Sequence, residues 1–512
     1  MTKPDRRPKN NSIARMVFVA ISLVFQVGWI LMRVQWLNEY SELISAFTGL
    51  LAITVVLKLN SKNTNSAMKM PWVMLIMAFP VMGLSMYLMF EMFGDPGVGR
   101  RLRKVREGIG ALFPQDAERA FSHLQAQDLS AANQCRYLWQ RAGYPVYENT
   151  SVKYYPEGVL ALEDMKEELR KAKSFIFMEY FIVEDESAFR ELEEILVDKV
   201  KQGVEVRLMY DDIGSVGKVN MIFAKRLNEK GIRCVPFNPA LPILNLFMNH
   251  RDHRKITVID GRVGFTGGYN LADEYFDRAH PYGKWKDTGL KLEGEAVRSL
   301  TATFLELWDV QVRETEDLSR YTDIRHSVPA RGFVLPFADD PLDDERVAEN
   351  VYLNLINQAN KSLYFMTPYL IITDEVEHAL ERAAMRGVDV RIITPGIPDK
   401  KTVYAVTRSY YPELIRQGVR IYEYTPGFCH AKQCICDGKI TTVGTSNLDY
   451  RSLYHHFEND VLLTGCGALE DIAADFEATF CQCREVTEAE CRNRSALLRA
   501  WQSILRLFAP LM

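Results

Sequence analysis

The sequence lacks the surplus of positive charge that nucleic-acid-binding proteins usually carry. Its 512 residues hold 62 lysines and arginines against 66 aspartates and glutamates, which gives a formal net charge of -4 at pH 7. General binding to a polyanionic backbone normally requires a basic footprint. The balance argues against such binding, and no nucleic-acid partner is expected.

The sequence also lacks the cysteine spacings that bind zinc or form redox pairs. It has nine cysteines, an odd number, and no Cys-x-x-Cys pair occurs. Zinc ribbons and thioredoxin-like sites depend on such pairs. We therefore expect reduced thiols in a non-oxidising compartment, with no bound metal and no cofactor.

No small-x-small cleavage site follows the first apolar run, Ile13–Met32, which disfavours a removed signal peptide. Two further apolar runs are Leu43–Leu57 and Met70–Phe93. The first and third approach the roughly 20 residues that a helix needs to cross a bilayer, whereas the second is short. A buried soluble hairpin is the alternative, but three such runs favour a membrane anchor over residues 1–95.

Basic residues near these runs leave the orientation and the number of spans open. They precede the first run, separate the second from the third, and follow the third. If all three runs cross, these groups fall on opposite sides of the membrane. The rule that cytoplasmic loops are rich in lysine and arginine then gives no clear answer.

The strongest pattern in the chain is a His-x-Lys pair followed, after four residues, by an aspartate, and it occurs twice. The first copy is His253, Lys255 and Asp260, and the second is His430, Lys432 and Asp437. In both copies a glycine lies 14 residues and an asparagine 17 residues after the histidine, at Gly267 and Asn270 and at Gly444 and Asn447. Chance does not produce two such matched copies.

The residue types in each motif predict that the motif contributes one half of a phosphate-binding site. Residues two apart on a strand project from the same face, so each imidazole lies beside an ammonium group. A cation beside a histidine repels a divalent metal but favours an oxyanion. Asp260 and Asp437 precede a glycine at a hairpin turn, and turn chemistry explains them without direct catalysis. We keep both with the catalytic motifs.

The two motifs lie in an internal repeat. An α/β rhythm begins near residue 151 and returns after about residue 340. Ser174–Met178 matches Ser362–Met366, and Gly203–Arg207 matches Gly387–Arg391. Strands that alternate with crossover helices imply mostly parallel sheets covered by helices.

This repeat predicts a pseudo-dimer with one shared site between its halves. A single linker near Ser319–Asp343 would join the two copies. The expected divisions are an anchor, a helical linker, two α/β domains and an amphipathic tail, at residues 1–95, 96–150, 151–330, 331–490 and 491–512.

Over roughly residues 151–490 this constellation resembles the phospholipase D superfamily. Asn65–Trp72, with Phe79-Pro80 in the following apolar run, is similar to the amino-terminal hairpin of bacterial cardiolipin synthases. The segments Phe177–Phe181 and Asn447–Ser452, and the pair Phe457-Glu458, are similar to the same enzymes. The resemblance implies two tandem α/β/α repeats behind a transmembrane anchor. It places the protein in the cell membrane as a multi-pass protein, with the catalytic halves in the cytoplasm.

The resemblance implies a phosphatidyltransferase that converts two phosphatidylglycerol molecules into cardiolipin and glycerol through a phosphohistidine. A phosphodiester is anionic, so a site must neutralise its oxygens, a task suited to the motif lysines and to Asn270 and Asn447. The superfamily most often uses the first-motif histidine as nucleophile. This assigns attack to His253 and acid/base work to His430.

Two carboxylates are candidates for holding the histidine rings in the right tautomer. Asp287 lies seven residues before Gly294, and Glu458 lies seven residues before Gly465. The resemblance points to Asp287 and Glu458 as these partners, and a surface carboxylate is the alternative for each.

Weaker signals come from the remaining histidines and from the tail. His250 and the pair His455-His456 could touch substrate, but solvated or core histidines are commoner. The tail either lies on an anionic membrane surface or packs on the domain. Its apolar residues at helical spacing are Leu497, Leu498, Trp501, Ile504, Leu505 and Phe508.

Two other functions stay open. A membrane-bound phospholipase D would hydrolyse a phospholipid to phosphatidic acid or transfer to another alcohol, and would differ only in the acceptor. A non-catalytic, membrane-tethered phospholipid-binding protein is the third possibility. Two complete motifs argue against it, because binding alone does not require two histidines at matched spacing. The expected partners are phosphatidylglycerol and the membrane.

Overall fold

The computed structural model describes residues 42–62, 64–92, 96–110, 117–239, 250–313, 317–322, 324–343 and 345–511, together with Val24 and Gly28. These residues fall into two compact units. One comprises Met1–Pro96 and Asn238–His250 with Leu511, and the other comprises the remainder. The first apolar run, Ile13–Met32, lies outside the described residues except for Val24 and Gly28.

The smaller unit contains α2 (Glu42–Ser61), α3 (Ser66–Ala78) and α4 (Pro80–Met92). One apolar cluster joins these helices, made of Ala52, Val55, Leu59, Ile76, Leu84 and Tyr87. The Asn65 side chain caps α3 by accepting from the Ala67 N–H at 2.8 Å.

The third apolar run forms two helices, where its length suggested a single span. Phe79 leaves helical geometry at φ -136°, and Pro80 opens α4. Proline suits this first position, because its missing N–H is not needed there and its φ is already helical. None of the helices in the described ranges is long and apolar enough to cross a membrane.

Helices occupy most of the described residues between 96 and 142, where the sequence predicted a helical linker. Its helices are α5 (Pro96–Gly110), α6 (Ala117–Gln127) and α7 (Leu129–Tyr137), and a π-helical turn follows at Leu138–Ala142. Arg106 on α5 forms ion pairs with Glu306 at 3.5 Å and Asp340 at 3.3 Å.

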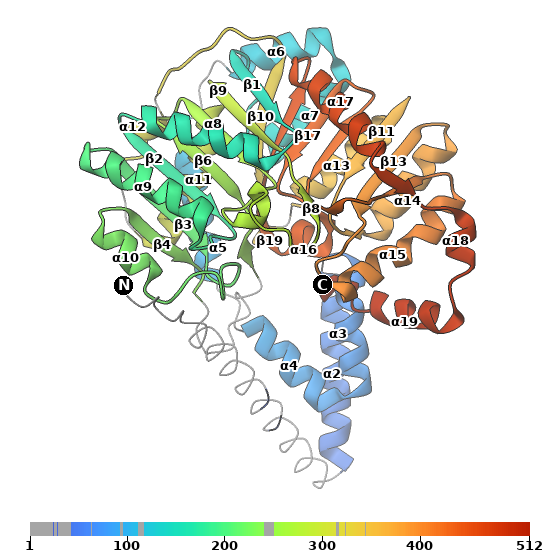
Figure 1. The fold of residues 1–512 in the computed structure, drawn as a ribbon. Helices are drawn as coiled ribbons and strands as arrows, with labels where there is room; N and C mark the ends of the chain where they lie inside the picture. The colour runs from blue at the N-terminus through green and yellow to red at the C-terminus, as the bar shows by residue number, and fades with distance from the viewer. Residues whose placement is uncertain are drawn as a thin grey trace, which may run out of the picture. The chain divides into compact units, whose positions relative to one another are not determined.

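Two mixed sheets form the core of the larger unit and lie side by side (Figure 1). The first has the order β1-β9-β7-β6-β2-β3-β4, with bounds β1 (Thr150–Tyr155), β2 (Phe175–Tyr180), β3 (Glu205–Asp211), β4 (Arg233–Phe237), β6 (Lys255–Ile259), β7 (Val263–Gly267) and β9 (Gly289–Gly294). The second has the order β10-β19-β17-β16-β11-β13-β14-β20, with bounds β10 (Phe333–Asp339), β11 (Ser362–Met366), β13 (Asp389–Pro395), β14 (Arg420–Tyr424), β16 (Gln433–Cys436), β17 (Ile440–Gly444), β19 (His456–Thr464) and β20 (Cys483–Glu485).

The matching strand orders confirm the internal repeat, but the prediction of mostly parallel sheets is wrong. In the first sheet only β2–β3 and β3–β4 pair in parallel. The pairs β2–β6, β6–β7, β7–β9 and β1–β9 are antiparallel. Each motif strand returns through a tight turn, at Asp260-Gly261 or Asp437-Gly438, and so short a connection can only join antiparallel strands.

Helices cover the sheets and fill the space between the halves. In the first half they are α8 (Gly158–Lys171), α9 (Ser187–Lys201), α10 (Phe223–Glu229) and α11 (Val297–Val312). In the second they are α13 (Val347–Gln358), α14 (Asp374–Met385), α15 (Lys401–Arg416), α16 (Tyr450–Tyr454) and α17 (Ala468–Phe480), followed by α18 (Glu488–Arg492) and α19 (Ala496–Arg506). The helix α11 contacts β10 of the second sheet, and α17 contacts β1 of the first.

The predicted linker Ser319–Asp343 also belongs to the fold. It contains the short helix α12 (Ser319–Thr322) and β10, which is paired along its whole length with β19. A buried strand therefore replaces the expected free connection. One apolar cluster includes side chains of both halves, among them Phe177, Trp308, Val334 and Val461.

Candidate active site

Two short strands carry the motif histidines across to the opposite half. In the first half β5 (Arg251–Asp252) pairs in parallel with the start of β19, and His253 N–H donates to the Phe457 carbonyl oxygen at 2.9 Å. In the second half β15 (Gly427–Cys429) pairs with β8 (Lys284–Lys286). The His430 N–H donates to the Lys286 carbonyl oxygen at 2.7 Å.

Each histidine is held by the carboxylate of the other half. His253 Nδ1 lies 2.8 and 2.9 Å from the Glu458 oxygens, and His430 Nδ1 lies 2.6 Å from Asp287 Oδ2. Both rings and both acids are buried. The structure thus brings together the two histidines and the two acids that were singled out, and it adds that the pairs are exchanged between halves.

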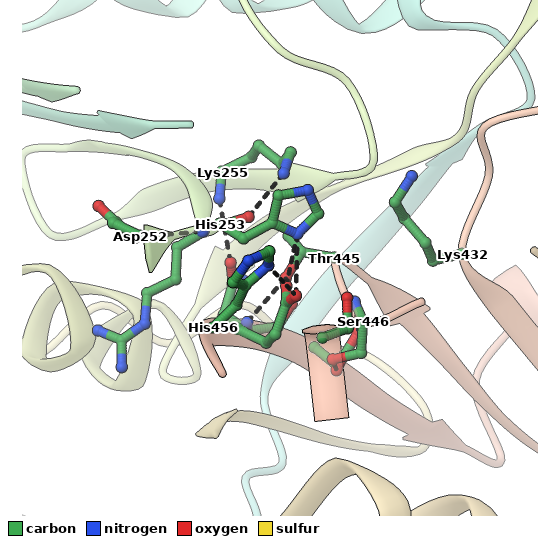
Figure 2. A network of polar contacts seen from close by, with 12 residues as sticks. Asp252, His253, Lys255, Lys432, Thr445, Ser446 and His456 are labelled. Carbon is green, nitrogen blue, oxygen red and sulfur yellow. Dashed lines mark hydrogen bonds and ion pairs between the residues drawn. The ribbon is translucent and has the colours of Figure 1, made fainter. Parts of the chain in front are cut away.

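Both motif lysines point into the same buried region, where Figure 2 shows Lys255, His253 and Lys432. Lys255 Nζ donates to the His253 carbonyl oxygen at 2.6 Å, and Lys432 Nζ donates to that of His430. Burial lowers the pKa of Lys255 to about 7, against the attraction of Glu458. Burial also lowers the pKa of Lys432 to about 8, against the attraction of Asp287. Two ammonium groups in a buried site favour an anionic ligand.

The imidazoles are kept neutral in the absence of a ligand. Burial lowers the pKa of His253 well below its usual value, and Lys255 lowers it further. Burial and Lys432 lower the pKa of His430 to about 4, while Asp287 opposes them.

The pKa values of the two acids are shifted in opposite directions. Burial raises the pKa of Glu458 well above its usual value, against the attraction of Lys255. Burial would also raise the pKa of Asp287, but the proximity of His430 outweighs it and the pKa is lowered. Asp287 is therefore the ionised partner. A proton on the imidazole is better stabilised at His430 than at His253.

The motif glycines permit the acid-bearing strands to approach closely. A Cβ on Gly267 would lie 2.4 Å from the Thr288 carbonyl oxygen, and one on Gly444 would lie 2.5 Å from the Asn459 carbonyl oxygen. Thr288 follows Asp287, and Asn459 follows Glu458. The fixed spacing from histidine to glycine thus positions the acid of each pair.

The two motif asparagines do not have the same surroundings. Asn270 is fully engaged, since its Oδ1 accepts from Ile182 N–H at 3.0 Å and its Nδ2 donates to Tyr275 at 2.8 Å. Asn447 Oδ1 is buried and has no hydrogen-bond partner within the part of the chain that the structure describes. The side chain of Asn270 therefore helps to hold the protein together, whereas the unpaired atom of Asn447 is an acceptor, which does not bind a phosphate oxygen, so the phosphate contacts expected for the two asparagines stay predictions.

The motif aspartates lie at the opposite end of the motif strands from the histidines. Asp260 accepts from the backbone N–H groups of Lys173, Ser174 and Phe175 at 2.7 to 3.0 Å. Asp437 accepts from the equivalent backbone N–H groups of the second half, those of Asn360, Lys361 and Ser362. Strand pairing thus makes Phe175 equivalent to Ser362, one residue away from the match made in the sequence. Both aspartates have φ 53°, as their turns require. These contacts are those of turn residues, as the sequence indicated, and a direct part in catalysis stays an untested prediction.

Two residues beside the rings are not among the predicted site residues: His456, which the sequence offered only as a weak candidate, and Trp285. His456 lies two positions before Glu458, with its ring centroid 5.5 Å from that of His253. Trp285 lies two positions before Asp287, with its ring centroid 5.3 Å from that of His430. The period of a β-strand, which places residues two apart on one face, was the signal that could have found them.

His456, His253 and Glu458 have potential ligand atoms within 4.8 Å of one another, which is a geometry that could suit a metal ion. The chemistry fits a cation poorly. His253 Nδ1 is already hydrogen-bonded to Glu458, and the charge of Lys255 acts on both His253 and His456. We derive no step through a metal.

Comparisons with known proteins agree with this geometry. The family model described as "Cardiolipin synthase, PLD-like domain" matches residues 165–308 and 352–482. An uncharacterized protein of Streptococcus mutans serotype c is 43% identical over 443 residues, 86% of this chain and 96% of that protein. A cardiolipin synthase of Halalkalibacterium halodurans is 34% identical over 510 residues, 97% of this chain and 99% of that protein.

A solved structure shows the same fold. The phosphatidylserine synthase of Haemophilus influenzae Rd KW20 superposes with a TM-score of 0.55 at 15% identity, covering 74% of this chain and 98% of that one. Together with the family match and the curated relatives, the duplicated histidine–lysine site identifies this chain as a member of the phospholipase D-like cardiolipin synthase family.

Proposed function

We propose that this protein is a cardiolipin synthase, which transfers a phosphatidyl group from one phosphatidylglycerol to another and releases glycerol. The observation that carries the proposal is the pair of exchanged histidine–acid contacts at one buried site with two lysines. Its curated relatives named cardiolipin synthase, which match nearly the whole chain, support the same reaction.

In the first step His253 is the nucleophile. Its Nδ1–H donates to Glu458, which leaves Nε2 free to form a bond to phosphorus. The bond from phosphorus to the glycerol oxygen breaks, and protonated His430 donates its proton to that oxygen. The bound phosphodiester anion raises the pKa of His430, because a nearby negative charge favours the protonated ring. Phosphatidyl-His253 and glycerol result.

In the second step His430 acts as the base. It takes the proton from a hydroxyl group of a second phosphatidylglycerol, whose oxygen then bonds to phosphorus. The phosphorus–nitrogen bond breaks, and cardiolipin leaves with both histidines restored. Lys255 and Lys432 neutralise the phosphoryl oxygens throughout.

A product assay tests the reaction. Purified full-length protein in detergent, given labelled phosphatidylglycerol, should form cardiolipin and glycerol in equal amounts. A chelator should not change the rate, and His253→Ala and His430→Ala should both lose the activity. Phosphatidic acid as the sole product would mean that water is the acceptor and would establish the phospholipase D alternative.

The membrane anchor over residues 1–95 belongs to this proposal. Its support is the three apolar runs of the sequence and the lipid substrate of the proposed reaction. The multi-pass location in the cell membrane, the cytoplasmic side for the catalytic halves and the domain divisions stay predictions. Reporter fusions at Asn65 and at the carboxyl terminus would test the topology.

A further inference from the structure

The carboxyl-terminal helix α19 presents a row of large apolar side chains to solvent. Leu497 is 81% exposed, Trp501 52% and Ile504 50%, and Phe508, just after the helix, is 48% exposed. We call these four residues the apolar face of α19. Single exposed apolar residues are ordinary on protein surfaces, but a contiguous group marks an interaction site.

The rest of α19 is fixed to the larger unit. Leu505 and Gln502 are buried, and Gln502 Nε2 donates to the Ala405 carbonyl oxygen at 3.0 Å. Arg506 pairs with Glu377 at 2.5 Å and lies over the Tyr410 ring at 4.0 Å. Of the two expectations for the tail, packing on the domain is thus confirmed for one side of the helix. It leaves the apolar face without a described partner.

The charged residues of this segment of the chain are all basic, and one of them, Arg506, is paired with Glu377 of α14. From Asn493 to Met512 the chain carries Arg494, Arg499 and Arg506 and no acidic residue, in a protein with a net charge of -4. An apolar stripe flanked by arginines suits the boundary between acyl chains and anionic headgroups. An apolar protein partner would not call for this local excess of positive charge.

Contacts connect α19 to the active site. The helix packs on the first turns of α15, which begins just after Asp399. Tyr369 donates to Asp399 at 2.6 Å, and its ring lies 6.3 Å from that of Phe428. Phe428 in turn lies 5.8 Å from His430, centroid to centroid.

We infer that the apolar face of α19 docks on the surface of an anionic phospholipid bilayer and brings the active site to its lipid substrate. The inference deepens the proposed function, on which it rests. Because α19 is held by α15, docking would orient the larger unit as well as bind it.

The test compares the activity of each variant on phosphatidylglycerol in two physical forms, a bilayer and a dispersed short-chain lipid. Full-length Leu497→Gln/Trp501→Gln is assayed on vesicles of phosphatidylcholine and phosphatidylglycerol, and on dihexanoyl-phosphatidylglycerol dispersed below its critical micelle concentration. We expect a loss of about tenfold on vesicles and less than about twofold on the dispersed lipid, because only the vesicle assay requires docking. The matched control is Leu160→Gln/Met385→Gln, which alters exposed apolar residues of α8 and α14 and should change neither rate.

A second readout is independent of the reaction. Vesicles that contain brominated lipid should quench the fluorescence of wild-type protein more than that of Trp501→Phe. Equal losses on both substrates, no loss on vesicles, or no difference in quenching would overturn the inference. A protein that makes only phosphatidic acid, yet shows the quenching difference, would disprove cardiolipin synthesis and leave the docking in place.

Discussion

The two halves of the active site share one backbone plan and differ in the side chains that support it. In each half a histidine hydrogen-bonds to the strand that carries the other half's acid. The His253 ring lies beside Glu458, whose pKa is raised, and beside His456. Around His430 stand Asp287, with a lowered pKa, and Trp285. The repeat supplies two histidines, and their neighbours give them different surroundings.

The comparison teaches that an ionised acid marks the proton-carrying histidine. An ionised carboxylate at Nδ1 stabilises an imidazolium, which is the form a general acid needs. A carboxyl group whose pKa is raised stabilises an imidazolium less, and the neutral ring is the form a nucleophile needs. These opposite shifts are in line with the proposed roles of His253 as nucleophile and His430 as acid.

The largest expected effect tests this division directly. His253→Asn should lower kcat/KM by at least ~10⁴-fold and leave no covalent intermediate, because the attacking nitrogen is gone. His430→Asn should lower the rate of physiological transfer by about 10²- to 10⁴-fold, the usual contribution of a general acid. With a p-nitrophenyl phosphodiester, whose leaving group needs no proton, His430→Asn should accumulate labelled protein that survives rapid quenching. Label on His253→Asn would reverse the two roles.

Substitution of the two acids should also lower kcat unequally, and by smaller factors than substitution of the histidines. Asp287→Asn removes a negative charge and should lower kcat about 10³-fold, approaching the loss seen when a triad aspartate is neutralised. Glu458→Gln replaces a group whose pKa is already raised, so a loss of only about 10- to 100-fold is expected. Kinetics measured in parallel on the two isosteric variants give the ratio of the two losses of kcat. Equal losses would show that the acids are equivalent.

The lysines should set the alkaline limit of activity. Their charged form is required, and it is lost as pH rises through pKa values of about 7 for Lys255 and about 8 for Lys432. The kcat/KM should therefore fall as pH increases through this range, since that parameter reports the free enzyme. A pH profile on a substrate that does not titrate would show it. A level profile would mean that the ammonium charges are dispensable.

The smallest effect on catalysis is expected at the motif aspartates. Asp260→Ala and Asp437→Ala each remove an acceptor for three backbone N–H groups and place alanine at φ 53°. The free energy of unfolding should fall by about 1–3 kcal/mol, while kcat/KM of the folded protein changes less than about threefold. Urea unfolding with kinetics at low temperature separates the two quantities, and the Asn variants, which tolerate the turn, are the controls. A large loss of activity in a stable variant would support the catalytic assignment.

Much of the site could be predicted because its residues lie at short, fixed spacings in the sequence. His253 and Lys255 are two residues apart in the sequence, and the second motif repeats that spacing, although His253 precedes β6 and does not share a strand with Lys255 as the sequence suggested. The glycines at 267 and 444 sit where a Cβ would collide with the acid-bearing strand, so their spacing is also local. Counting from later glycines found Asp287 and Glu458 for the same reason.

The remaining features depend on contacts distant in sequence. The exchange of acids between halves joins residues 205 and 143 positions apart, which periodicity does not encode. The residues of β10 were predicted to be a linker, because their pairing with the distant strand β19 cannot be inferred from the local sequence. Asn270 and Asn447 occupy identical motif positions, and only their surroundings separate them. His456 was set aside because a histidine beside another histidine carries no spacing signal of its own.

The exchange of acids has a consequence for how the protein is made. When the ribosome has synthesised the first half, His253 is present but Glu458 has not yet been made, because it lies 205 residues further along the chain. A chain that ends before β19 therefore lacks the carboxyl group that holds the His253 ring, and both exchanged histidine–acid pairs can form only once β19 has been made.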